Sequence, residues 1–270
     1  MISILMSTQN PIEKYFKKSM DSIFNQTYKD FELVLIDDGS EKPVIDFIKK
    51  QGYDINKIRY VRLERNVGLP KALNIGLKEC SGDYIARMDD DDLMDETRLE
   101  KQLNYVEQNN LVGCFCWYDN IDTEDNIINS CSISISEKDY LQQLLKKGNI
   151  FCHASLFIKK NVLEEIDGYD ENLRYAQDSD LYIRILNKYK MGMVKEYLLQ
   201  HRKNSYRNNS YRETLSLTYA LFGAMNYYTD CEKIGIKEKI SIFIRLMRYY
   251  VGILRISKKK KISKEEKTND

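Results

Sequence analysis

The sequence predicts an α/β fold with a mostly parallel central sheet flanked by helices. Short β-type runs alternate with helical patterns at intervals of about 30 residues along the first half of the chain. Such alternation implies right-handed crossovers and a sheet covered on both faces. With 270 residues, 43% of them hydrophobic, the chain can bury a substantial core. Sheets of this class bind ligands at the carboxyl ends of their strands.

The individual elements follow from hydrophobic periodicity. Strands are expected at residues 2–6, 31–37, 58–63, 83–88 and 111–118, and helices at residues 11–25, 43–51, 69–79 and 95–109. The last of these helices carries Leu99, Leu103 and Val106 on one face. From about residue 212 the pattern becomes helical, which predicts a C-terminal helical extension.

Composition narrows the classes of function. A net charge of +1 creates no global field that would attract nucleic acid, so no nucleic-acid partner is expected. The six cysteines are scattered and read as reduced thiols; Cys114 and Cys116 share a strand face, but with only two histidines a zinc thiolate site is disfavoured. The N-terminal run "ISILM" has no basic region before it and no cleavage site. We therefore expect a cytoplasmic protein.

Two acidic clusters follow predicted strands. Asp37 and Asp38 close the strand "FELVLID", and the run Asp89 to Asp92 closes the strand "DYIARM". Both clusters should lie on the same rim of the sheet. Asp-Gly-Ser is also ordinary turn chemistry, so the first cluster has a structural interpretation. Four consecutive aspartates exceed what a turn or helix cap needs, because like charges repel unless a cation or partner relieves them.

A third acidic segment, "YAQDSDLYIRIL", has the apolar spacing of a helix that begins near Asp178. Asp178 could therefore serve only as the helix N-cap. The positive end of a helix also favours an ionised carboxylate, so a cap and a chemical role are compatible.

Two sets of motifs follow one another along the chain. The first set is "SILMSTQN", "SIFNQTYKDFELVLIDDGS", "NVGLPKALNIGL", "GDYIARMDDDD" and "RLEKQ". The second set is "HASLFIKK", "EIDGYDENLRYAQDSDLYIRIL" and "LLQHRKNSYRNNS". In order and spacing these motifs resemble the inverting family 2 glycosyltransferases of the GT-A fold, and the second set matches the acceptor-side half of that family. The resemblance implies a GT-A domain over residues 1–210, with a nucleotide-sugar half of about 1–112 and an acceptor half of about 113–210, followed by the extension 211–270.

The resemblance assigns donor-binding roles. Its Asp-X-Asp motif falls on Asp89, Asp90 and Asp91, of which Asp91 touches the metal and Asp89 and Asp90 face the ribose and diphosphate, with Asp89 a second metal candidate. Oxygen-rich, histidine-poor ligation suits Mg²⁺ or Mn²⁺, which would stabilise the leaving diphosphate. Nucleobase recognition falls to Asp38, Ser7 and Gln9, although many relatives have an aromatic residue in place of Gln9. Lys71 and Arg87 could approach the diphosphate or be exposed charges.

The same resemblance implies the acceptor-side roles. Inverting displacement needs a carboxylate base, and Asp178 stands where the family has it; Gln177 replaces the usual glutamate, and Asp180 is the supporting or second candidate. His153 is read either as a structural hydrogen-bonding residue or as an acceptor-site residue. His201 is a candidate extra metal ligand, although it lies out of the family register, and Arg202 is a candidate diphosphate contact.

The C-terminal helix admits two readings. In "EKISIFIRLMRYYVGILRISKKKK", Arg245, Arg248 and Arg255 form a basic stripe and four lysines follow. Such a helix could pack on the domain or in a dimer. We expect instead that residues 240–261 make peripheral contact with an anionic membrane, at the inner face of the cytoplasmic membrane. Three arginines argue against a spanning helix.

These observations together predict metal-dependent, inverting transfer of a sugar from a nucleoside diphosphate donor, a UDP-hexose in our reading, to a hydroxyl of a glycan or lipid-linked acceptor in cell-surface polysaccharide synthesis. A non-catalytic nucleotide-sugar or cation-binding module is the alternative. A nucleotidyltransferase is less favoured, because "STQNPIEK" is not a glycine- and basic-rich triphosphate loop. The sequence does not identify the sugar, the acceptor, the linkage or the oligomeric state, and a homo-oligomer stays open.

Overall fold

The computed structural model describes residues 1–173 and 176–203, together with the single positions 240, 244 and 247. Those three positions, Ile240, Ile244 and Met247, are helical and about half exposed. The rest of the predicted C-terminal extension, with its basic stripe and the expected membrane contact, lies outside the described residues. Within the described part of the chain, no helix is both long and apolar enough to cross a membrane.

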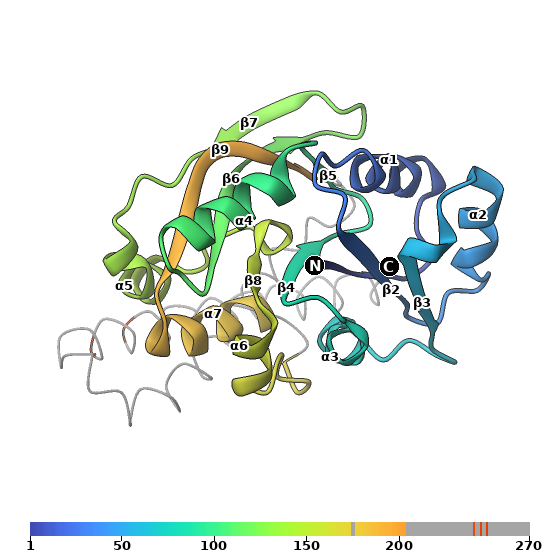
Figure 1. The fold of residues 1–270 in the computed structure, drawn as a ribbon. Coiled ribbons are helices and arrows are strands. Elements are labelled where there is room, and N and C mark those ends of the chain that lie inside the picture. The colour runs from blue at the N-terminus through green and yellow to red at the C-terminus, as the bar shows by residue number, and fades with distance from the viewer. Residues whose placement is uncertain (174–175, 204–239, 241–243, 245–246, 248–270) are drawn as a thin grey trace, which may run out of the picture.

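The first half of the chain forms a parallel sheet with helical crossovers (Figure 1). Its elements are β1 (Ile2–Thr8), α1 (Glu13–Phe24), β2 (Phe31–Asp37), α2 (Val44–Gln51), β3 (Ile58–Arg62), α3 (Leu69–Glu79) and β4 (Tyr84–Met88). The strands lie in the order β3-β2-β1-β4, and every neighbouring pair is parallel. The predicted strands and helices of this half are confirmed, with boundaries that differ by a few residues.

The second half extends the same sheet. It comprises β5 (Leu93–Met94), α4 (Arg98–Gln108), β6 (Gly113–Ile121), β7 (Ile127–Cys131), α5 (Tyr140–Lys147), β8 (Phe157–Lys159), α6 (Lys160–Glu165), α7 (Gln177–Lys188) and β9 (Met191–Arg202). The full order is β3-β2-β1-β4-β8-β6-β9-β5, with β7 beside β6. Strand β8 runs antiparallel to both β4 and β6, whereas β6 and β9 are parallel. The sheet is therefore parallel from β3 to β4 and mixed beyond β4.

Period-two alternation in the strands buries both faces of the sheet. In β1, Leu5 faces a core that includes residues of α3, α5, α6 and α7, whereas Ile4 and Met6 face a core that includes residues of α1, α2 and α4. A strand buried on both sides reads as a continuous apolar run, and "ISILM" does so. Cys114 and Cys116 are buried, and both belong to the second core, as their spacing predicted.

The register places the carboxyl ends of three strands together. Thr8 at the end of β1 pairs with Asp37 at the end of β2, and Met6 pairs with Met88 at the end of β4. Both acidic clusters therefore follow strands that end at the same edge of the sheet, as predicted. This edge is called the donor rim below; it consists of Thr8, Asp37, Asp38 and the run Asp89 to Asp92.

Candidate active site

The two aspartates after β2 have different surroundings. Asp37 is fully buried, and its carboxylate accepts hydrogen bonds from the main-chain N–H groups of Ser40 (2.9 Å) and Val44 (3.2 Å) and from the hydroxyl of Tyr60 (2.5 Å). Burial by itself would raise the pKa of Asp37, but these donors lower it below its ordinary value. Asp37 therefore holds the turn together.

Asp38 is turned toward the loop before α3. Its carboxylate accepts from the main-chain N–H groups of Val67 (2.7 Å) and Gly68 (3.1 Å), and its own N–H donates to the carbonyl oxygen of Thr8 (2.8 Å). A carboxylate can accept further hydrogen bonds beyond these two, so Asp38 keeps capacity for a ring N–H of a base. Asp38 is 3% exposed, which places it at the floor of the rim.

The four aspartates after β4 are separated by distinct partners. Asp89 accepts a hydrogen bond from the guanidinium of Arg87 at 2.5 Å, and Asp90 accepts from the hydroxyl of Thr8 at 2.5 Å. Burial would raise the pKa of Asp89, but the Arg87 charge lowers it to about 2. Arg87 is 1% exposed, so it lies beneath Asp89 and the structure does not place it on the rim surface for the expected diphosphate contact.

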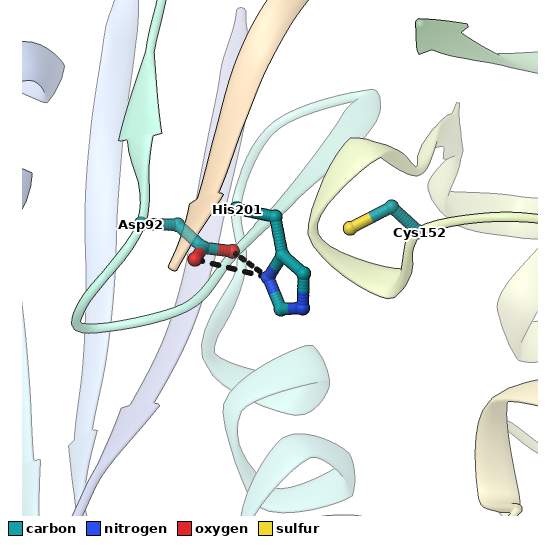
Figure 2. A group of neighbouring side chains, drawn as sticks. All are labelled: Asp92, Cys152 and His201. Atoms are coloured by element: carbon teal, nitrogen blue, oxygen red, sulfur yellow. Dashed lines mark hydrogen bonds and ion pairs between the residues drawn. The ribbon is translucent and has the colours of Figure 1, made fainter. Parts of the chain in front are cut away.

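Asp92 is a member of the donor rim that is held inside the fold. It is fully buried, and its carboxylate accepts from the main-chain N–H of Arg202 (2.8 Å) and lies 3.1 Å from Nδ1 of His201 (Figure 2). Burial would lower the pKa of His201, but the Asp92 carboxylate raises it above its ordinary value. Together with Cys152, these side chains bring three ligand-type atoms within 4.8 Å of one another. The pairing through Nδ1 fixes the orientation of the ring and hence of Nε2.

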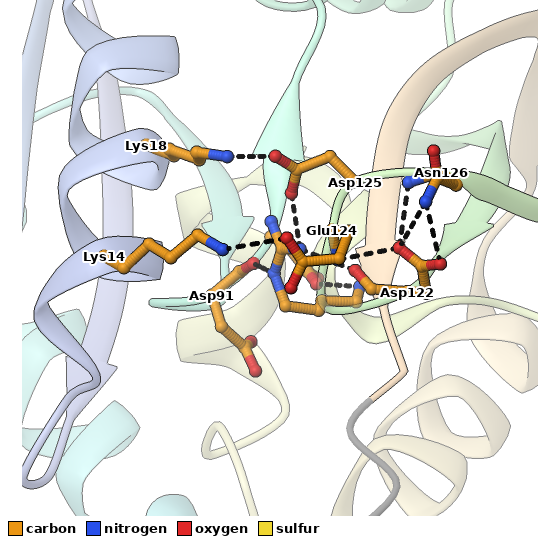
Figure 3. A network of polar contacts seen from close by, with 9 residues as sticks. Lys14, Lys18, Asp91, Asp122, Glu124, Asp125 and Asn126 are labelled. Atoms are coloured by element: carbon orange, nitrogen blue, oxygen red, sulfur yellow. Dashed lines mark hydrogen bonds and ion pairs between the residues drawn. The ribbon is translucent and has the colours of Figure 1, made fainter.

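Arg202 joins Asp91 to the turn between β6 and β7. Its guanidinium donates to the carbonyl oxygens of Asp91 (2.9 Å) and Asp122 (2.7 Å) and pairs with the carboxylate of Asp125 (2.6 Å). Its side chain is fully buried, so the structure gives Arg202 a packing role and does not bring it to the position expected for a diphosphate contact. In Figure 3 the carboxylate of Asp91 points away from this network. Asp91 is half-buried.

Asp178 lies in the first turn of α7, two residues after the N-cap Ala176. The expectation that Asp178 might be only the cap is therefore not met. One carboxylate oxygen accepts from the main-chain N–H of Ser179 (2.8 Å) and the other from the side-chain amide of Asn149 (2.6 Å). Burial raises the pKa of Asp178, which makes its carboxylate a stronger base.

Asp180, the second carboxylate of this helix, is committed to an internal ion pair. It is 3% exposed and lies 2.7 Å from the guanidinium of Arg184, which also donates to the carbonyl oxygen of Ile166 at 2.6 Å. The hydrogen bond from Arg184 to Ile166 joins α7 to the end of α6. The two carboxylates of α7 therefore differ: Asp178 is half-buried, whereas Asp180 is buried and paired with Arg184.

His153 and Tyr169 form a hydrogen-bonded pair that is affected by charges of the aspartate run and of α7. Nε2 of His153 is 2.8 Å from the hydroxyl of Tyr169. Burial and the nearby Arg87 charge lower the pKa of His153 to about 3, so the imidazole is neutral at pH 7. Burial raises the pKa of Tyr169, and the charges that act on its phenol include those of Arg87, Asp89 and Asp178. Tyr169 is therefore within electrostatic range of both Asp178 and Asp89.

The remaining predicted donor residues are placed as follows. Ser7 is half-buried near the end of β1, and Gln9 is exposed in the loop after it. Lys71 is exposed in the first turn of α3, three residues after Gly68. All three lie in or next to segments that contact Asp38 or Thr8, but no contact of their side chains assigns them a role.

Sequence reasoning missed the residues that hold the site in place. Thr8 binds both acidic clusters, Tyr169 connects the two sides, and Asn149 binds Asp178. The polar end of "ISILMST" was a signal for Thr8. Asn149 and Tyr169 lie in loops without periodicity, so only the three-dimensional arrangement reveals them.

The arrangement has the parts of a group-transfer site. Several carboxylates follow the ends of neighbouring parallel strands. A separate carboxylate of raised pKa, Asp178, acts through its charge on Tyr169, which pairs with His153. A family model described as "Glycosyl transferase family 2" matches residues 3–167. The chain belongs to glycosyl transferase family 2.

Curated relatives of this family 2 glycosyltransferase carry the same activity in their names. This chain is 33% identical over 227 residues to the uncharacterized glycosyltransferase MJ1057 of Methanocaldococcus jannaschii, and the match covers 82% of this chain and 78% of the relative. It is 36% identical over 195 residues to the O-antigen biosynthesis glycosyltransferase WbnJ of Escherichia coli, covering 70% of this chain and 72% of the relative.

Solved structures share the fold of this glycosyltransferase. S. aureus TarS 1-349 in complex with UDP-GlcNAc superposes with a TM-score of 0.70 at 16% identity, covering 93% of this chain and 72% of TarS. The mannosyltransferase PcManGT of Pyrobaculum calidifontis, in complex with GDP-Man and Mn²⁺, superposes with a TM-score of 0.65 at 14% identity, covering 91% of this chain and 68% of PcManGT. At these identities the likeness shows the fold alone, and the expected GT-A fold is confirmed.

Proposed function

We propose that this glycosyltransferase transfers a hexose from a UDP-sugar to a hydroxyl of a glycan or lipid-linked acceptor, with inversion and with the help of a divalent cation. The observation that carries the proposal is the grouping of Asp38, the run Asp89 to Asp91 and Asp178 around Thr8, His153 and Tyr169. The O-antigen relative supports a surface polysaccharide as the product. UDP is our choice of nucleotide because TarS binds UDP-GlcNAc, and GDP-mannose is the comparison donor because PcManGT binds it.

The donor side would bind through oxygen ligands and hydrogen-bond acceptors. In this proposal Asp38 accepts a ring N–H of the base, with Ser7 and Gln9 beside it, and Asp90 lies near the ribose. The donor set fits Mg²⁺ or Mn²⁺, because these ions prefer carboxylate oxygens and the run Asp89 to Asp91 supplies three carboxylates directly after β4. Asp91 would hold the ion, and Asp89 and His201 are the further candidates. When bound, the ion supplies positive charge beside the diphosphate.

The acceptor side would supply the base. Asp178 takes the proton of the acceptor hydroxyl. At the same time the hydroxyl oxygen bonds to the anomeric carbon, on the face opposite the diphosphate. The bond between that carbon and the diphosphate oxygen breaks, and UDP leaves with the electron pair. A carboxylate of raised pKa near a neutral His153 suits this step, because no positive charge from the imidazole weakens the base.

Replacing Asp178 by Asn tests the proposal. The variant should bind UDP with Mn²⁺ as the wild type does but transfer at least about 100-fold more slowly, since a positioned general base contributes about 10²- to 10⁴-fold. UDP release from a panel of UDP-sugars and GDP-mannose measures turnover, and calorimetry measures binding. Asp167→Asn is a matched control, because Asp167 is exposed at a positive φ that Asn tolerates. Undiminished turnover in Asp178→Asn would refute the base.

The alternative, a non-catalytic binding module, predicts a different pattern. In that case Mn²⁺ with UDP would raise the melting temperature, yet no sugar nucleotide of the panel would be consumed by the wild type at any pH.

A further inference from the structure

The side chain of Asn149 contacts the carboxylate that we propose as the base. Its Nδ2 donates to Oδ2 of Asp178 at 2.6 Å. Its Oδ1 accepts from the main-chain N–H of Phe151 at 2.9 Å. Because the amide oxygen is already used by this N–H donor, the amide nitrogen must face Asp178. The orientation of the amide is therefore set by the chain itself.

The loop that carries Asn149 is anchored to the helix of the base. Gly148 ends α5 at a φ of 97°, a conformation that favours glycine, and its N–H donates to the carbonyl oxygen of Leu144. Phe151, two residues after Asn149, stacks on Phe115 with ring centroids 4.1 Å apart and lies edge-on to Tyr182 at 5.7 Å. Tyr182 is one turn after Asp178 on α7. The aromatic cluster thus fixes the distance between Asn149 and Asp178.

We propose that Asn149 is the positioning residue of the base, holding the Asp178 carboxylate at a fixed rotation and favouring its ionised form. The inference rests on the proposed function for its catalytic meaning. The second oxygen of Asp178 is held by the N–H of Ser179, so two donors from two elements restrain the carboxylate. A lone pair of Oδ2 stays available for the acceptor hydroxyl, since a carboxylate oxygen accepts two hydrogen bonds. The family resemblance gives the orienting role to a glutamate at position 177, but Gln177 carries no charge. In this chain the side-chain amide of Asn149 takes that role.

The electrostatic consequence has a definite sign. An N–H donor stabilises a charged carboxylate, so Asn149 lowers the pKa of Asp178 while burial raises it more. The phenols of Tyr169 and Tyr182 also interact with this carboxylate, and both stay neutral because burial raises their pKa. Arg87, Asp89 and Arg184 act on Tyr169 and are unchanged by substitutions at position 149.

Two substitutions in the full-length chain test the inference. Asn149→Ala removes the donor, and the pKa of Asp178 should rise by about one unit, as expected for a hydrogen bond to a charged group. Asn149→Asp is isosteric and keeps the acceptor for the Phe151 amide, so it preserves the loop; two carboxylates in contact should raise the apparent pKa further. Carboxyl-carbon NMR of ¹³C-aspartate protein reports the titration, and the Asp178 signal is assigned by its absence in Asp178→Asn.

Turnover gives the second readout. In both variants the acid limb of the pH profile for UDP release from the active UDP-sugar should move to higher pH by the same amount as the NMR titration. Asn172→Ala is the control, because Asn172 is an exposed amide bonded to Asp170, and it should leave both curves in place.

The outcomes separate this inference from the proposed function. An unchanged Asp178 titration in both Asn149 variants overturns the inference whatever the enzyme does. A shifted titration with an unshifted pH profile supports the Asn149 contact and overturns Asp178 as the base.

Discussion

Two adjacent aspartates at the donor rim, Asp37 and Asp38, make different contacts. Asp37 is fully buried beneath the turn, whereas Asp38 binds the loop at Val67 and Gly68. The pattern "IDDGS" predicts an acidic turn but not this difference, because both residues have the same side chain. Only the direction of each carboxylate, set by the end of β2, distinguishes them.

The role of Asp37 can be measured through stability. Asp37→Asn should lower the free energy of unfolding by about 2 kcal/mol at pH 7, because three donors lose an ionised acceptor. The folded-state pKa of Asp37 is depressed, so its contribution is complete above the unfolded-state pKa and is lost as the pH falls through the folded-state value. The difference between wild type and variant should therefore shrink below about pH 4.

Urea denaturation between pH 7 and pH 3 measures this difference. Asp46→Asn serves as the control, because Asp46 is exposed on α2, and it should change stability by no more than about 0.5 kcal/mol. A difference between wild type and Asp37→Asn that stays constant down to pH 3 would contradict the assigned role.

The prediction of the aspartate run was partly successful at the residue scale. Its location on the rim followed from the strand pattern, and the need for partners followed from like-charge repulsion. Which partner each residue takes did not follow, because Thr8, Arg87 and His201 reach the run from different strands. Arg202, a predicted diphosphate contact, is buried in the structure, and so is Asp92, the one member of the run to which no binding role was assigned.

At the scale of elements, the turn after β2 positions the loop before α3. Gly39 has a φ of +70°, and an added Cβ would lie 2.4 Å from the carbonyl carbon of Arg65. That loop supplies the N–H groups that bind Asp38. The turn and the loop can approach each other this closely only because residue 39 has no side chain.

Gly39→Ala should therefore be destabilising and should weaken UDP binding. Positive φ costs about 1 kcal/mol for alanine, and displacement of the loop adds to that cost, so we expect a total of about 2–4 kcal/mol. Gly52→Ala is a matched control: its φ is +76°, but nothing lies within 4 Å of the added Cβ. Urea denaturation and calorimetry with UDP and Mn²⁺ give the two readouts. Equal losses of stability and of UDP affinity in the two variants would contradict the role given to the close approach of Gly39 to the loop at Arg65.

Element prediction succeeded in the first half of the chain, whereas strands β5, β7, β8 and β9 of the second half were not predicted. The parallel strands of the first half are apolar runs bounded by turns, and their helices are amphipathic. Strands β5 and β8 have two and three residues, too few to show a period. Strand β7 is exposed along most of its length, so it carries no apolar alternation. Such strands form because their neighbours in the sheet supply the hydrogen bonds.

At the scale of the whole molecule, charged side chains join the two halves beside the site. The turn between β6 and β7 lies against α1 through Lys14 with Glu124 and Lys18 with Asp125, as Figure 3 shows. Asp125 also pairs with the buried Arg202, which binds the carbonyl oxygen of Asp91. The sequence predicted two halves but not this junction, because its partners are about 80 to 110 residues apart.

Removing the charge of Asp125 should loosen this junction. Asp125→Asn keeps the shape and tolerates the positive φ of 70°, but it leaves Arg202 without its carboxylate. Because the guanidinium is buried and Asp125 is partly exposed, we expect a loss of about 2 kcal/mol in unfolding free energy. Glu124→Gln, which affects only the exposed pair with Lys14, should cost less than about 0.5 kcal/mol. Similar losses in the two variants would contradict the role of Arg202.

The buried position of Asp92 affects how mutational scans of this enzyme should be read. If Asp91 holds the ion as proposed, a screen that records only product would score Asp92 as essential alongside Asp91, since loss of Asp92 frees the end of β9 from the rim. The loss at Asp92 would then be a defect of folding and the loss at Asp91 a defect of chemistry. Melting curves distinguish them, and a catalytic assignment from activity alone would count one aspartate too many.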